Sequence, residues 1–92
     1  MAKFTVRMVL HDADWDDYIS LASEMAERGF VDTIVGASGN TYTLPDAEYY
    51  GSAADIEAAM NHAKAAAGAV GKKYAVFITQ SAATKWVGLE KA

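Results

Sequence analysis

The order of the strand-like and helix-like patterns constrains this chain more than any single motif does. Residues 4–10 alternate apolar and polar side chains, which predicts a strand, and the Ala-rich run that ends at Gly71 has helical spacing. In chain order, the predicted elements are a strand at 4–10, a helix at 14–28, strands at 31–35 and 41–44, a helix at 52–70, and strands at 73–79 and 84–89. The sequence therefore predicts β-α-β-β-α-β followed by an extra C-terminal strand.

This element order predicts how the layers pack. Right-handed crossovers place both helices on one face of an antiparallel sheet, so we expect an α+β fold of the ferredoxin-like sandwich type. The length suits one domain with one core over residues 1–92. The run at 73–79 is apolar on both faces, which predicts a central strand. Val9 and Phe77 would lie on the uncovered sheet face, and such a face predicts a homodimer through sheet faces or edges.

Both helices begin near side chains that can cap them. Either Asp12 or Asp14 can accept hydrogen bonds from the free N–H groups of the first helix. Ser52 is predicted to begin the second helix, with Asp55 completing a weak capping box. The apolar stripe of the first helix is expected to contain Trp15, Ile19, Ala22, Met25 and Ala26, with Tyr18 and Leu21 beside it.

The composition limits the possible partners. Twelve acids and eight bases give a formal charge of −4. This balance argues against strong non-specific nucleic-acid binding, which needs clustered Lys and Arg, although a bound divalent cation can dominate the local electrostatics. The chain has no cysteine, which excludes thiolate metal sites. No apolar run reaches the roughly 20 residues of a membrane helix and no leader pattern is present, so we expect a cytoplasmic protein without membrane contact.

Two adjacent residues after the first predicted strand are candidates for catalysis. Asp12 could hold a divalent metal, and a symmetric dimer would bring a second copy of it nearby. His11 could act as an acid or base near neutral pH. Each has a structural alternative, since Asp12 can cap the helix and no Asp-His-Ser arrangement follows from the spacing.

The candidates for RNA binding are two arginines and several aromatic residues. Arg7 and Arg28 could contact phosphate by bidentate donation, although Arg28 could equally serve the C-terminal end of its helix. The aromatic side chains that could stack on bases are Tyr42, Tyr49, Tyr50 and Trp86. Aromatic residues at strand positions more often pack against their neighbours, and no basic groove is evident beside them.

Four segments of the chain resemble a known family. They are Phe4-Thr5-Val6-Arg7 through Asp12, Trp15-Asp16-Asp17-Tyr18, Met25-Ala26-Glu27-Arg28-Gly29-Phe30, and Tyr42-Thr43-Leu44-Pro45-Asp46-Ala47-Glu48-Tyr49. Together they resemble small phage- and prophage-associated proteins that are grouped with the GhoS-type endoribonuclease antitoxins. The fold of that group is similar to the Cas2-like nucleases of CRISPR systems.

This resemblance implies a ferredoxin-like protein that binds or cleaves single-stranded RNA. Asp12 matches the acidic position after the first strand of Cas2-like proteins and would position a water or a divalent metal such as Mg²⁺. His11 would then move a proton, and Arg7 and Arg28 would hold phosphate.

A second function class remains open from the sequence. The chain could be a non-catalytic interaction module of a mobile element that dimerises through its sheet and binds a host or phage protein. Its acidic segment, Asp12–Asp17, could then imitate nucleic acid and block a basic partner.

Overall fold

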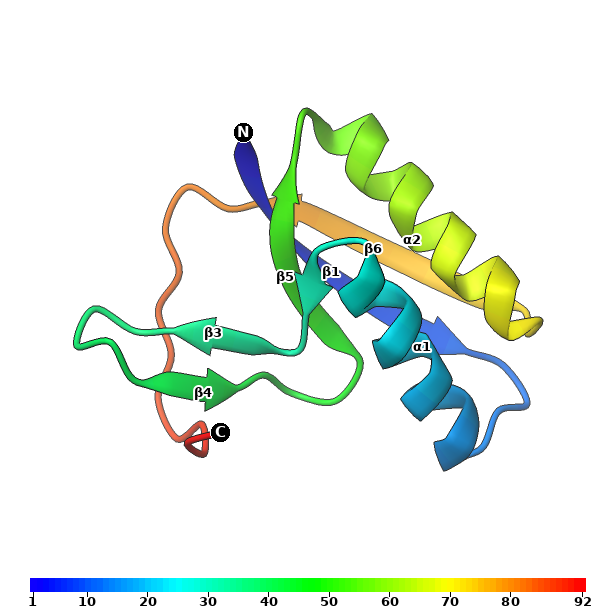
Figure 1. The fold of residues 1–92 in the computed structure, drawn as a ribbon, viewed down its shortest axis with the longest axis horizontal. Coiled ribbons are helices and arrows are strands. Elements are labelled where there is room, and N and C mark those ends of the chain that lie inside the picture. Colours follow the sequence, from blue (N-terminus) through cyan, green and yellow to red (C-terminus); the bar gives the residue numbers. More distant parts are fainter.

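A computed structural model describes all residues, 1–92, and contains two helices and six strands. The chain has an α+β fold in which both helices lie on the same side of the larger sheet (Figure 1). In chain order the elements are β1 (Ala2–Leu10), α1 (Trp15–Glu27), β2 (Phe30–Val31), β3 (Thr33–Val35), β4 (Thr41–Thr43), β5 (Glu48–Ala53), α2 (Ile56–Val70) and β6 (Tyr74–Gln80).

The strands form two separate antiparallel sheets. The larger sheet has the order β2-β5-β1-β6, so β1 is central and pairs with β5 on one side and with β6 on the other. The smaller sheet is the β3–β4 hairpin, which extends away from the helices (Figure 1). The hairpin also holds the end of the chain, because the Thr43 N–H donates to the Glu90 carbonyl and the Ala92 N–H donates to the Thr41 carbonyl.

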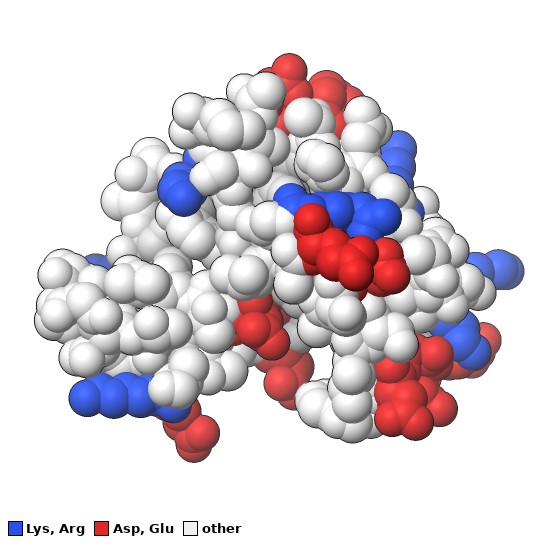
Figure 2. Space-filling model, in the orientation of Figure 1, with Lys and Arg blue, Asp and Glu red and all other residues white.

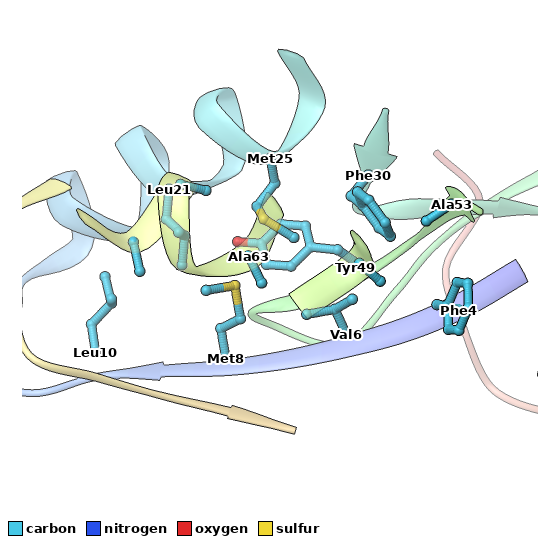
Figure 3. Packing of buried hydrophobic residues seen from close by; sticks show 13 residues of the cluster. Phe4, Val6, Met8, Leu10, Leu21, Met25, Phe30, Tyr49, Ala53 and Ala63 are labelled. Atoms are coloured by element: carbon cyan, nitrogen blue, oxygen red, sulfur yellow. The ribbon is translucent and has the colours of Figure 1, made fainter. Parts of the chain in front are cut away.

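The core lies between the larger sheet and the helices, as the alternation in residues 4–10 predicts. Every second side chain of β1 is buried, and Figure 3 shows these side chains facing those of the helices. The buried residues of β1 are Phe4, Val6, Met8 and Leu10. Helix α1 contributes Leu21 and Met25, whereas α2 contributes only alanines: Ala59, Ala63, Ala66 and Ala67. Small side chains on α2 let its backbone pack close to the sheet.

The cap of α1 settles one of the alternatives left open by the sequence. The Asp14 carboxylate accepts from the Asp17 N–H at 3.0 Å, and the Asp17 carboxylate accepts from the Asp14 N–H at 3.1 Å. This reciprocal pair is a capping box, and it leaves Asp12 without a capping role. At α2 the cap is Asp55 and not Ser52, so the predicted start of the second helix was too early.

Strand β5 is the element that the sequence analysis did not predict. No strand was predicted at residues 48–53, and the second helix was expected to begin at Ser52, yet these residues pair with residues 2–7 of β1. The segment contains Gly51, Ser52 and Ala53, which have low strand propensity. Its stability comes from tertiary pairing and from burial of alternate residues, Tyr49, Gly51 and Ala53.

Two further strand predictions were wrong. Strand β6 lies at the edge of the sheet and not at its centre, because its outer side has no neighbouring strand. Residues 84–89 form no strand, and the C-terminal segment makes only an isolated bridge between Lys91 and Tyr42. Trp86 instead packs against Tyr42, with ring centroids 5.6 Å apart.

The buried side of α1 is rotated from the predicted stripe. Trp15 and Ile19 are 67% and 53% exposed, while Leu21 and Met25 are fully buried. The Tyr18 hydroxyl contributes to this orientation, because it accepts from the Leu10 N–H at 3.0 Å and donates to the Leu10 carbonyl at 3.3 Å. Neither helix combines the length and apolar character that a membrane crossing requires.

Candidate nucleic-acid interface on the open sheet face

The side of the larger sheet that faces away from the helices, here called the open face, collects side chains from three strands. Because side chains alternate along a strand, the residues between the buried ones on β1 point to this face. The strand register adds residues of β5 and β6 to the same face. The open face carries Lys3, Thr5, Arg7 and Val9 from β1, Glu48, Tyr50 and Ser52 from β5, and Ala75, Phe77 and Thr79 from β6.

One end of the open face joins a basic group to an aromatic ring. The Lys3 ammonium lies 5.8 Å from the centroid of the Tyr50 ring, which is within the range of a cation–π contact. Both side chains line a groove of about 720 Å³, and Trp86 from the C-terminal segment lies on the same groove. The groove therefore offers two aromatic rings and one cation to a ligand.

The other end repeats this combination on neighbouring strands. Arg7 and Phe77 are directly paired across β1 and β6, and Phe77 is 71% exposed. The Arg7 guanidinium also lies 3.6 Å from the Glu48 carboxylate, with its side chain 66% exposed. A pair this exposed contributes little to stability, so Arg7 can exchange Glu48 for a phosphate at small cost. Lys3 and Arg7 are four residues apart on β1, which corresponds to about 13 Å.

The second candidate arginine lies elsewhere and already has partners. The Arg28 guanidinium donates to the Glu24 carbonyl at 2.8 Å and to the Glu24 carboxylate at 2.9 Å. Both contacts are at the C-terminal end of α1, on the helix side of the sheet. Arg28 therefore serves the end of its helix, and the structure does not bring it together with Arg7.

His11 and Asp12 lie in the loop between β1 and α1, and both are exposed. The His11 N–H donates to the Lys73 carbonyl at 2.8 Å, which extends the pairing of β1 with the chain before β6. Asp12 has a φ of 52°, a left-handed conformation that few residues other than glycine adopt. No group of three or more His, Asp or Glu side chains is placed to hold a metal ion.

A second cavity, of about 740 Å³, lies between α1, the end of β1 and the loop before β5. Trp15, Tyr18 and Tyr49 are among the residues that line it, together with Asp32. Tyr49 is 3% exposed. Burial, and secondly the charge of Asp32 and the neighbouring Tyr18, raise the pKa of Tyr49 to about 12.

This shift predicts a loss of stability at high pH. Below pH 10 Tyr49 is neutral in both the folded and the unfolded chain. As the pH rises from 10 to 12 the unfolded chain loses the phenol proton first, so the free energy of unfolding should fall by about 2 kcal/mol. Urea unfolding at pH 9, 10, 11 and 12 measures this fall.

The matched variant for this prediction is Tyr49→Phe, which keeps the buried ring and removes the titrating hydroxyl. Between pH 10 and pH 12 the free energy of unfolding of this variant should fall by about 2 kcal/mol less than that of the wild type. Tyr74→Phe, at an exposed tyrosine, controls for the general effect of losing one phenol. Parallel pH curves for the wild type and Tyr49→Phe would contradict the prediction.

The aromatic candidates from the sequence thus separate into different roles. Tyr49 belongs to the core, Tyr42 and Trp86 pack on each other, and Tyr50 lies on the open face. Lys3 was not predicted as a site residue. Its proximity to Tyr50 depends on the pairing of β1 with β5, and the low strand propensity of residues 51–53 concealed that pairing.

No family model, no curated protein and no solved structure matches this chain.

Proposed function

We propose that this protein binds single-stranded RNA on its open face, as a GhoS-like protein. The observation that carries the proposal is the gathering of two cations, Lys3 and Arg7, with two aromatic rings, Tyr50 and Phe77, on one uncovered sheet surface. Single-stranded RNA is recognised by aromatic rings that stack on unpaired bases and by cations that contact the backbone.

The strand arrangement supports the ferredoxin-like part of this proposal. If the β3–β4 hairpin is regarded as an insertion, the remaining order is β1-α1-β2-β5-α2-β6, which is β-α-β-β-α-β. Sheets of this kind present one face to the helices and leave the other free for a ligand. The hairpin and the C-terminal segment would then be additions that form one wall of the Trp86 groove.

The surface charge supports the choice of face. On the helix side, Figure 2 shows acidic and basic side chains in small separate groups, with no continuous basic surface. On the open face Lys3 and Arg7 outnumber Glu48, although the whole chain carries −4. With about two phosphates neutralised, the logarithm of the RNA affinity should fall with the logarithm of salt concentration with a slope of about −1.4.

RNA binding should weaken when either open-face ring is removed. Stacking on one base contributes about 1–3 kcal/mol, so Tyr50→Ala and Phe77→Ala should each reduce the affinity roughly 5- to 150-fold. Fluorescence anisotropy with a labelled single-stranded RNA of mixed sequence, in 50 mM salt, measures the change.

Tyr74→Ala is the control for this experiment. It removes an aromatic ring from β6 at a position paired with Leu10, on the helix side of the sheet, and should leave the affinity unchanged. Absence of binding by the wild type at low salt would overturn the proposal. Equal losses in all three variants would show that the open face has no special role.

RNA cleavage is the second part of the proposal, and Asp12 is its candidate carboxylate. Asp12 is exposed, takes no part in the helix cap and has a left-handed backbone. Its carboxylate is therefore free to contact RNA or a metal ion. One carboxylate together with RNA phosphates suits Mg²⁺, which keeps several waters and supplies an activated water when bound. His11, next to Asp12, is the proposed proton carrier.

A non-catalytic interaction module is the alternative, and the start of α1 favours it. Asp16 and Asp17 occupy the first turn, and Asp12 and Asp14 precede it. Acidic side chains gather over this end of the helix in Figure 2. Such a segment could occupy the basic nucleic-acid site of a host or phage protein. A chain that binds no RNA but displaces RNA from a basic partner would belong to this class.

A further inference from the structure

Strand β6 has a free outer edge that lacks the usual protection. Its seven residues contain no charged side chain, no proline and no glycine, and five of them are aromatic or β-branched. Natural proteins protect edge strands with charges, prolines, bulges or very short length, because an open edge pairs with other strands. The opposite edge of this sheet, β2, is only two residues long. The exposed edge of β6 is therefore the one that requires a partner.

The hydrogen bonds to β1 determine which groups of β6 point outward. The Ser81 N–H donates to the Lys3 carbonyl and the His11 N–H donates to the Lys73 carbonyl. These bonds join directly opposite residues at the two ends of the segment in which β1 and β6 pair. In an antiparallel pair the bonded residues alternate, so the odd-numbered residues of β6 bond to β1. The backbone groups of four residues consequently face outward: Tyr74, Val76, Ile78 and Gln80.

We infer that β6 pairs antiparallel with β6 of a second copy of this chain, about a two-fold axis at Phe77. This register pairs Tyr74 with Gln80 and Val76 with Ile78, so that all four outward-facing residues bond across the interface. Phe77 then lies opposite Phe77 of the second copy, on the open face. Aromatic pairs directly opposite each other stabilise antiparallel strands, and no like charges oppose them here.

The pairing would join the two sheets into one surface. Arg7 neighbours Phe77 on β1, so the row across the dimer would run from Arg7 through both Phe77 rings to the second Arg7. At about 4.8 Å between strands the two Arg7 positions would be about 14 Å apart. This inference extends the proposed RNA interface from one chain to two, but it depends only on β6 and can be tested without RNA.

Engineered cysteines test the register directly, because the chain has no cysteine of its own. Opposite residues of a non-bonded antiparallel pair have Cα atoms about 4.5 Å apart, within the range of a disulfide. Phe77→Cys should therefore form a disulfide-linked dimer under mild oxidation. Val87→Cys is the control, since Val87 is 95% exposed and lies outside β6, and it should stay unlinked. No cross-link in Phe77→Cys, or equal cross-linking of both variants, would overturn the inference.

Light scattering after size exclusion provides an independent measurement. The wild type should have twice the chain mass of 9.8 kDa. Phe77→Glu, which places two like charges opposite each other, should have the chain mass, and Val87→Glu should remain a dimer. A monomeric wild type would overturn the inference. Loss of RNA binding in Tyr50→Ala with an unchanged dimer mass would separate the two proposals.

Discussion

Gly51→Ala should destabilise the fold more than alanine at any other glycine of the chain. Gly51 is buried in β5 between Phe4 of β1 and Phe30 of β2. A Cβ at this position would collide with the Gly29 carbonyl oxygen and lie 2.8 Å from Phe30 Cδ1. Because the first of these atoms belongs to the backbone just before β2, the start of β2 must move with it. We expect a loss of about 3 kcal/mol in the free energy of unfolding.

That loss is large for a chain of this length. Domains of about 90 residues have a total stability of about 5–14 kcal/mol, so the melting temperature should fall by about 15 °C. Gly68→Ala is the matched control, since nothing lies within 4 Å of a Cβ at this exposed position in α2. It should stabilise the helix by about 1 kcal/mol. Thermal unfolding followed by circular dichroism measures both variants, and equal melting temperatures would contradict the packing argument.

Asp12→Gly should abolish RNA cleavage without weakening the fold. Glycine accepts the φ of 52° at Asp12 without strain, so the stability should stay the same or rise by up to about 1 kcal/mol. Removing a catalytic carboxylate should lower Mg²⁺-dependent cleavage of single-stranded RNA by about 100-fold or more. Gel analysis of RNA incubated with Mg²⁺, or with EDTA, measures the cleavage, and thermal unfolding measures the stability.

Two further variants test whether the loss of cleavage is due to the charge of Asp12. Asp12→Asn keeps a residue that tolerates left-handed backbone and removes only the charge, so it should be as inactive as Asp12→Gly. Asp46→Asn removes an exposed acid from the loop before β5 and should cleave normally. Full cleavage by Asp12→Gly would exclude Asp12 from the reaction, and cleavage that persists in EDTA would exclude a metal.

Local patterns in the sequence predicted the α+β class, the buried side of β1 and a hairpin turn at residues 36–40. These features depend on alternation or turn residues within a few positions, which one sequence displays. The patterns did not predict that the strand expected at 31–35 divides into β2 and β3, or that the β3–β4 hairpin forms a sheet of its own. The position of β6 at an edge could not be predicted in this way, because an apolar strand can have the same pattern at the centre of a sheet and at its edge. The cap of α1 was ambiguous for a similar reason, since Asp12 and Asp14 have the same chemistry and only the backbone distinguishes them.

The site was less predictable than the fold. Arg7 was a predicted site residue, but its neighbours Phe77 and Glu48 are brought to it by long-range pairing. The cation–π contact between Lys3 and Tyr50 likewise depends on β5, whose Gly51 and Ser52 do not indicate a strand. For Arg28 the sequence left two roles open, phosphate binding and service to the end of its helix, and the bonds to Glu24 match the second.

The attachment of the chain end to the hairpin predicts that these two parts unfold together. The bonds from Thr43 to Glu90 and from Ala92 to Thr41 join the last residues to the small sheet and not to the core. The small sheet also contains no part of the buried cluster between β1 and the helices. We therefore expect the hairpin to open and the C-terminal segment to be released in one event, while the larger sheet stays folded. Substitutions in the hairpin and the C-terminal segment could therefore change which ligand the Trp86 groove binds, with little effect on the stability of the larger sheet and its helices.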